Sequence, residues 1–113
     1  MAARYRVTIR RTGRTEKTRH ATAAAALDHL ESELRALATT QRPRVARALG
    51  RDYEPVRQVA ARGELRGPGG LRAGIDVRGD GSTEAFTGRI VRRVVTAHDG
   101  EDAYTALRRV AAR

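Results

Sequence analysis

The chain has 113 residues, enough for a single domain (residues 1–113) with its own core, and it contains no cysteine, which excludes disulfide bonds and cysteine-ligated metals. Its formal net charge is +10, with 23 lysine and arginine residues against 13 acidic residues. This surplus favours a polyanionic partner, either nucleic acid or an acidic protein. The sequence shows neither an apolar leader after Met1 nor an apolar run of membrane-spanning length, so we expect a cytoplasmic protein with no membrane partner.

The first elements expected are the two strands of a β-hairpin. Between residues 4 and 10, the apolar residues Tyr5, Val7 and Ile9 alternate with basic and polar residues, which predicts a strand with one buried face. A glycine-containing turn follows. Residues from about 14 to 20 contain no apolar side chain and therefore predict an exposed edge strand.

A helix is expected over residues 22–39, with Thr22 as its N-cap. Apolar side chains recur there at the 3.6-residue period of an amphipathic helix. They are Ala23, Ala26, Leu27, Leu30, Leu34, Leu37 and Ala38. Pro43 and the two threonines before it predict the end of this helix. Residues 43–62 then predict a shorter helical segment, although Gln58–Leu65 also fits a strand.

A second hairpin is expected from strands at residues 71–78 and 83–96. The residues between them contain the glycines and the aspartate that are typical of a hairpin turn. Arg78-Gly79-Asp80 is therefore interpreted as part of this turn rather than as an adhesion motif. The longer strand is apolar on both faces near its end, which predicts either cover on both sides or a bulge at Gly88.

The last element expected is a helix over residues 100–112, with Asp99 and Asp102 at its start. The predicted fold class is therefore α+β: an antiparallel sheet from two β-hairpins, each followed by a helix (ββα–ββα), with a short helical segment in the middle. The predicted core consists of Val7, Ile9, Leu27, Leu30, Leu34, Leu37, Ile75, Val77, Phe86, Ile90, Val94, Leu107 and Val110.

Residues that could support catalysis are few, and we expect neither an enzyme nor a bound cofactor or metal. The three histidines lack metal-ligand spacing to one another. No phosphate-binding glycine loop and no nucleophile motif is present. The carboxylates of Asp76, Asp80 and Glu84 are expected to approach one another across the second hairpin, where acidic residues usually have structural roles.

Residues 45–65 fit the pattern of a helix-turn-helix, because Ala46 is small, Gly50 permits a sharp turn, and Val56 and Val59 would hold a second helix on the core. Together with the charge, this pattern predicts nucleic-acid binding, with the second hairpin as a wing. The expected contacts are Arg44, Arg47, Arg51, Arg57 and Arg62, with Arg89 and Arg93 on the hairpin. Three tyrosines and one phenylalanine are too few for stacking bases, so duplex DNA bound through its phosphates is favoured.

Two alternatives remain open from the sequence. The helical residues between 43 and 62 equally fit a helix pair that packs beneath the sheet. The protein as a whole equally fits a small α+β protein-interaction or assembly module, in which Thr15–His20 or Val91–Val95 pairs with another chain. Exposed strand edges of this kind also predict a homodimer.

Overall fold

The computed structural model describes residues 4–49, 59–88 and 91–111, and it describes their side chains except in residues 39–49. The elements follow one another as β1 (Tyr5–Arg11), β2 (Arg14–His20), α1 (Ala23–Leu49), β3 (Val59–Gly67), the short 3-10 turn η2 (Pro68–Gly70), β4 (Leu71–Arg78), β5 (Thr83–Thr87), β6 (Arg93–Val95) and α2 (Ala103–Ala111). The predicted α+β class is therefore confirmed.

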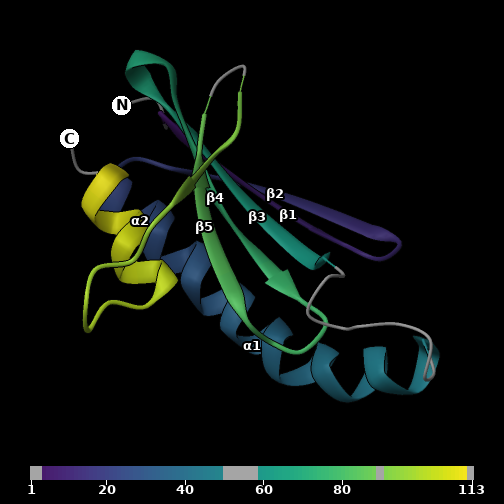
Figure 1. The fold of residues 1–113 in the computed structure, drawn as a ribbon. Helices are drawn as coiled ribbons and strands as arrows, with labels where there is room; N and C mark the ends of the chain where they lie inside the picture. The colour runs from purple at the N-terminus through teal and green to yellow at the C-terminus, as the bar shows by residue number, and fades with distance from the viewer. Residues whose placement is uncertain (1–3, 50–58, 89–90, 112–113) are drawn as a thin grey trace.

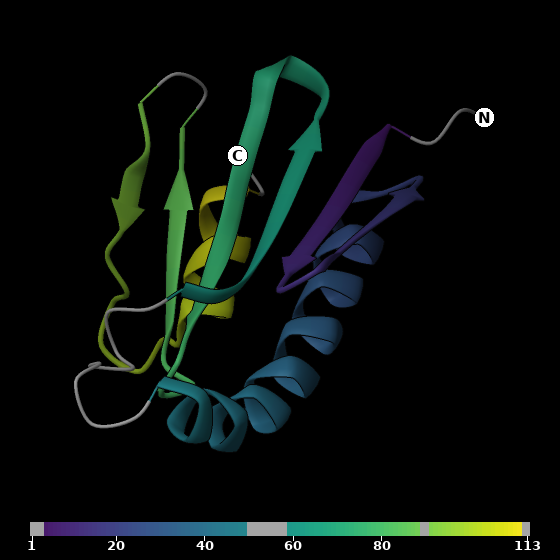
Figure 2. The ribbon, with the colours of Figure 1, turned by 90° about the vertical axis from the view of Figure 1, so that its right-hand side faces the viewer.

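The strands form one antiparallel sheet of six strands in the order β2-β1-β3-β4-β5-β6. Both helices lie on the same side of this sheet (Figures 1 and 2). Helix α1 packs mainly against β1 and β3, whereas α2 packs against β4 and β5. The two edges of the sheet are β2 and β6, as predicted for the strand at residues 14–20.

The core lies between the two helices and the sheet face that they cover. Nine predicted core residues are buried there: Val7, Ile9, Leu27, Leu30, Leu34, Leu37, Ile75, Val77 and Leu107. Val110 is partly buried against this core. Val94 was predicted as a core residue but is 57% exposed, and Phe86 is only half-buried. Both predictions are wrong because these two side chains point away from the helices; Ile90 lies outside the described residues.

The predicted ββα–ββα arrangement is wrong, because a strand that it lacks, β3, lies in the middle of the sheet between β1 and β4. Ala61, Gly63 and Leu65 direct this strand's buried face toward α1. Gly63 has a packing role there: a Cβ at this position would lie 2.8 Å from Leu34 Cδ1, so the missing side chain lets the helix approach the sheet closely.

The predicted helix-turn-helix is also wrong. Helix α1 does not end before Pro43 but continues to Leu49, so the expected shorter helix is not separate from it. The residues from Val59 onward, which would complete the second helix, form strand β3 instead, which agrees with the alternative of a strand over Gln58–Leu65. Tertiary pairing with β1 and β4 outweighs the helical preference of this alanine-rich segment.

The second hairpin turn is confirmed, but the long strand that follows it is divided in two. At the turn, Asp80 Oδ1 accepts hydrogen bonds from the backbone N–H and the hydroxyl of Ser82, at 2.9 and 2.6 Å. The return strand β5 ends at Thr87, and β6 pairs back against it. Gly88 has φ +138°, and a Cβ there would clash with the carbonyl oxygen of Val91, so glycine permits this reversal.

Both helices begin at polar caps, one of which differs from the prediction. Thr22 Oγ1 accepts a hydrogen bond from Ala25 N–H, as expected of the N-cap of α1. Helix α2 begins at Ala103 rather than at residue 100, because Asp102 Oδ1 caps Thr105 N–H at 2.8 Å. Glu101 instead accepts a hydrogen bond from the backbone N–H of His98, so Asp99 is not the cap.

Candidate functional site

The sheet face opposite the helices, called the open face below, carries most of the strand arginines. Side chains alternate along a strand, so the residues between the core positions of β1, β3 and β4 point away from α1 and α2. On β1 these residues are Arg6, Thr8 and Arg10; on β3 they are Arg62, Glu64 and Arg66; and on β4 they are Arg72, Gly74, Asp76 and Arg78.

Four arginines lie directly opposite one another across four neighbouring strands of the open face. The register pairs Arg19 of β2 with Arg6 of β1, Arg6 with Arg66 of β3, and Arg66 with Arg72 of β4. We call these four residues the arginine row. Neighbouring strands are about 4.8 Å apart, so the row extends over about 14 Å at the level of the backbone. Like charges placed directly opposite destabilise a sheet, so the folded protein carries an electrostatic cost here.

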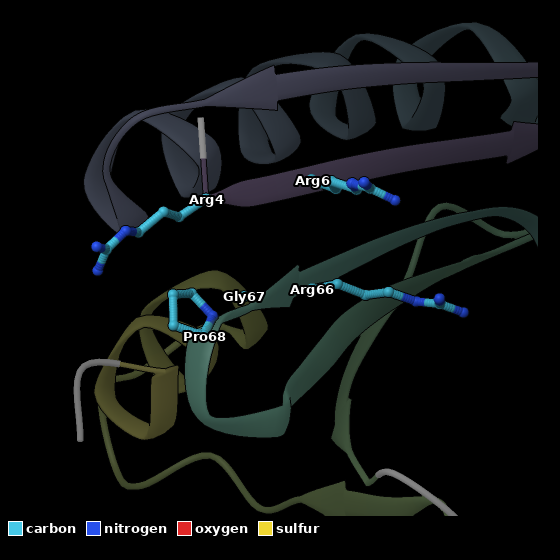
Figure 3. A pocket seen from close by; sticks show the side chains of 5 residues that line it. All are labelled: Arg4, Arg6, Arg66, Gly67 and Pro68. Atoms are coloured by element: carbon cyan, nitrogen blue, oxygen red, sulfur yellow. The ribbon is translucent and has the colours of Figure 1, made fainter. Parts of the chain in front are cut away.

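The arginine row borders an open depression of about 470 Å³ lined by Arg4, Arg6, Arg66, Gly67 and Pro68. Arg6 and Arg66 extend side by side in the same direction, whereas Arg4 extends the other way (Figure 3). Within the described part of the chain, no ion pair involves Arg4, Arg6 or Arg66. Their guanidinium groups therefore face solvent with their charge available to an anion.

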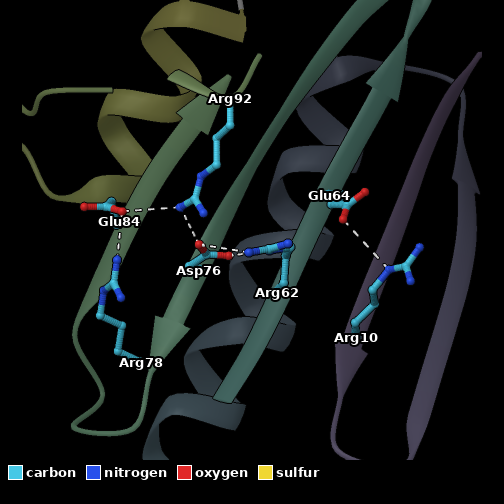
Figure 4. Close-up of polar contacts among 7 residues, drawn as sticks. All are labelled: Arg10, Arg62, Glu64, Asp76, Arg78, Glu84 and Arg92. Carbon is cyan, nitrogen blue, oxygen red and sulfur yellow. Dashed lines mark hydrogen bonds and ion pairs between the residues drawn. The ribbon is translucent and has the colours of Figure 1, made fainter. Parts of the chain in front are cut away.

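At the other end of the same strands, carboxylates neutralise the arginines. Asp76 is fully buried and accepts hydrogen bonds from Arg62 Nε, at 2.6 Å, and from Arg92 Nη2. Glu84 Oε1 binds Arg78 Nη2 at 2.9 Å and Arg92 Nη2 at 3.3 Å. These five residues meet across β3, β4 and β5 (Figure 4). We call them the ion-pair cluster: Arg62, Asp76, Arg78, Glu84 and Arg92. The hydrogen bond that Arg62 donates to Asp76 raises the pKa of Arg62 above its ordinary value, although burial opposes this change.

The aromatic ring of Phe86 packs against two guanidinium groups of the ion-pair cluster. The guanidinium carbons of Arg62 and Arg92 lie 5.5 and 4.6 Å from the centre of the Phe86 ring, within the range of cation–π contacts. The ring itself lies over Gly74, where a Cβ would come within 2.5 Å of Phe86 Cζ. Phe86 was predicted as a core residue. This packing explains why it is partly buried although it lies on the open face.

Of the seven predicted contact residues, only Arg62 and Arg93 have side chains that the structure describes, and these two lie on opposite sides of the sheet. Arg62 lies on the open face within the ion-pair cluster. Arg93 of β6 is in register with Thr87, which puts it on the opposite side of the sheet from Arg62. The other predicted contacts are less fully described. Arg44 and Arg47 belong to helix α1 but their side chains lie outside the described part, and Arg51, Arg57 and Arg89 lie wholly outside it.

The arginine row was missed by the sequence analysis. Alternation along residues 4–10 and 71–78 does indicate that Arg6 and Arg72 share a face with other basic residues. Their alignment with Arg66 depends on β3, where the prediction favoured a helical segment and kept a strand over Gln58–Leu65 only as an alternative. Sequence reasoning lacked the strand that joins the two halves of the row.

Two histidines that are distant in the sequence meet in the structure. The ring centroids of His20 and His29 lie 5.1 Å apart, and Thr18 Oγ1 lies 2.9 Å from His20 Nε2. Burial, and secondly the proximity of His29, lower the pKa of His20 below its ordinary value. Within the described ranges, no third histidine or acidic side chain joins them as a metal site would require.

None of the described helices has the length and apolar character needed to cross a membrane.

On the helix side, acidic and basic groups are joined in ion pairs. Glu31 of α1 binds Arg35 at 2.7 Å and Arg108 of α2 at 3.0 Å. Arg35 also binds Asp102 at 2.7 Å, and its guanidinium carbon lies 4.4 Å from the centre of the Tyr104 ring. Burial raises the pKa of Tyr104 to about 12. Arg35 and Arg108 are therefore engaged with carboxylates on the helix side, in contrast to Arg6 and Arg66 of the arginine row.

Acidic pH should weaken the fold by protonating these helix-side carboxylates. Burial alone would raise the pKa of Glu31, but hydrogen bonds from Arg35 and Arg108 bring it below its ordinary value of 4.5. A backbone hydrogen bond from Thr105 lowers the pKa of Asp102 in the same way. The unfolded chain therefore binds more protons than the folded one just below pH 4.5. We expect the urea midpoint to decrease first below about pH 6.5, where the lowered pKa of His20 acts in the same direction, and to fall further from about pH 4.5 downward; a midpoint unchanged at pH 3 would contradict this.

Together the fold and this surface define a small α+β protein whose open sheet face divides into a basic end and a charge-compensated end. No protein-family model matches the chain, and neither the curated proteins nor the solved structures contain a significant match to it.

Proposed function

We propose that this protein binds nucleic acid, and duplex DNA in particular, through the arginine row on its open face. The observation that supports the proposal is the alignment of Arg19, Arg6, Arg66 and Arg72 across four strands. Repulsion between these side chains is relieved when phosphates bind between them, so the ligand contributes stability where the isolated protein has a cost.

Arginine is suited to this contact because its planar fork donates two parallel hydrogen bonds to a phosphate. On the described part of the open face, bases have no comparable platform. Phe86 is half-buried there, and two guanidinium groups lie over its ring. Contacts to phosphates alone give binding that is largely independent of sequence, and they suit a duplex whose bases remain stacked inside. In this proposal the protein is a binding protein and not an enzyme.

Removal of Arg6 and Arg66 should weaken DNA binding and reduce its dependence on salt. If the four arginines of the row each neutralise one phosphate, the logarithm of the affinity should fall with the logarithm of the salt concentration at a slope of about −3 to −4. The double variant Arg6→Ala, Arg66→Ala should flatten that slope by about 2, since each lost phosphate contact removes about 0.9. Fluorescence anisotropy with a random-sequence duplex at several salt concentrations measures both quantities.

The strands supply a matched control, because Arg10 and Arg62 are also directly opposite one another on β1 and β3. These two arginines already have carboxylate partners in Glu64, at 3.8 Å, and Asp76, at 2.6 Å. The variant Arg10→Ala, Arg62→Ala changes the net charge equally but should retain the slope, with circular dichroism used to verify that both variants are folded. Absence of binding by the parent protein at low salt would refute the proposal, and equal effects of the two double variants would show that only net charge matters.

A second candidate function is a protein-interaction module, favoured by exposed apolar side chains at one edge of the sheet. Val91, just before the short edge strand β6, is 68% exposed, and Val94, within this strand, is 57% exposed. A strand from an acidic partner could add to this edge. This function becomes the preferred one if the parent protein fails to bind DNA at low salt. The homodimer and the cytoplasmic location stay predictions.

A further inference from the structure

The ion-pair cluster separates the arginines of the open face into two groups. Arg62 and Arg66 are four residues apart on β3, and Asp76 and Arg72 are four residues apart on β4, so the cluster and the row are about 13 Å apart along the strands. Both lie on the same face of the sheet. A long polyanion could therefore reach either group, unless something distinguishes them.

The carboxylates of Asp76 and Glu84 make that distinction. Asp76 is fully buried, so its charge cannot move away from Arg62 and Arg92 without disturbing β4. Glu84 holds Arg78 and the same Arg92. Two carboxylates thus occupy three guanidinium groups, and the Phe86 ring fixes two of these groups from below. A phosphate that approaches this end meets carboxylate oxygens at the positions that its own oxygens would take.

We propose that Asp76 and Glu84 act as internal counter-ions that exclude nucleic-acid phosphates from Arg62, Arg78 and Arg92. The bound backbone is thereby confined to the arginine row, and its path crosses the strands from β2 to β4 rather than following them. This inference rests on the proposed function. It goes beyond that function by limiting the number of phosphates that bind, because the two fixed carboxylates keep part of the basic surface from binding phosphate.

Glu84→Gln tests the inference without removing the buried carboxylate. The side chain of Glu84 is 33% exposed, and glutamine keeps its shape while it loses the charge. Arg78, and one contact of Arg92, then become available to phosphate. We expect the affinity for a random-sequence duplex at low salt to rise about threefold or more, and the salt slope to become steeper by about 1.

The matched control is Glu31→Gln on the helix side. Glu31 also holds two arginines, Arg35 at 2.7 Å and Arg108 at 3.0 Å, and its side chain is 26% exposed. This variant gains the same net charge on the opposite side of the sheet, so its salt slope should equal that of the parent protein. A rise of the slope in both variants would overturn the inference, because net charge alone would then explain the gain.

A second measurement keeps the test specific to Arg78. Arg78→Ala should leave the slope of the parent protein unchanged, but in the Glu84→Gln background it should remove most of the added slope. No change of affinity or slope in Glu84→Gln, with circular dichroism and thermal melting like those of the parent, would refute the role of internal counter-ions. Failure of the parent protein itself to bind DNA would instead refute the proposed function, so the two failures are distinguishable.

Discussion

Replacement of Leu34 by alanine should lower the free energy of unfolding by about 2–5 kcal/mol, because it leaves a cavity that the surroundings cannot fill. Leu34 is 0% exposed in the middle of α1. Its Cδ1 atom lies only 2.8 Å from the position that a Cβ of Gly63 would have, so Leu34 fills the space that this glycine leaves. Strand β3 has no side chain at that point that could move into the gap.

Urea denaturation followed by circular dichroism measures this loss. Val94→Ala is the control, because Val94 is also apolar but is 57% exposed on the open face, and its truncation should cost less than about 1 kcal/mol. Equal losses in the two variants would contradict the assignment of the core to the helix side of the sheet.

The elements that sequence periodicity predicted well are those whose apolar pattern is complete within the element. The alternation of Tyr5, Val7 and Ile9 and the leucine stripe of α1 each contain enough apolar residues to fix both the element type and its buried face. The helix caps were also partly predicted from the sequence. Thr22 was correctly predicted as the N-cap of α1, and Asp102 was predicted together with Asp99 at the start of α2. Local chemistry determines such features, so they require no knowledge of distant partners.

Strand β3 was only the alternative to a helix in the sequence analysis, over Gln58–Leu65, because its own residues carry little strand signal. Alanine, arginine, glutamate and leucine favour helices, and glycine favours neither structure, yet this segment pairs with both β1 and β4. Gly63 indicated a helix end in the sequence, whereas in the structure it serves the close packing of α1. The strand is therefore a product of tertiary context.

The candidate site depended on that missing strand. Arg66 joins Arg6 to Arg72 across β3, so the row exists only once the strand order and register are known. The surplus of arginine predicts a polyanionic partner, but the contacts were assigned to a helix-turn-helix whose last residues, from Val59 onward, form strand β3 instead. Composition suggests a class of partner, whereas strand register determines which side chains share one surface.

Loss of the buried carboxylate of Asp76 should be the other large effect on stability. Asp76→Ala removes the acceptor that Arg62 and Arg92 share above Phe86, so that Arg92 keeps, among its described ion pairs, only the one with Glu84 at 3.3 Å. Removal of one partner of a buried ion pair typically costs 3–5 kcal/mol, mostly because the remaining charge has lost its compensation. Because the side chains of Arg62 and Arg92 are 37% and 40% exposed, water can recover part of this loss, and we expect about 2–4 kcal/mol.

Asp28→Ala removes the same chemical group from an exposed ion pair and shows how much burial contributes to this effect. Asp28 binds Arg108 at 2.8 Å, but its side chain is 72% exposed, so its loss should cost less than about 1 kcal/mol. The two variants should be compared by urea denaturation at low and high salt, since salt screens the exposed pair more than the buried one. A cost for Asp76→Ala no greater than that for Asp28→Ala would mean that the guanidinium groups of Arg62 and Arg92 move into solvent once released. Asp76 would then not be a fixed counter-ion, and the division of the open face into two ends would lose its structural basis.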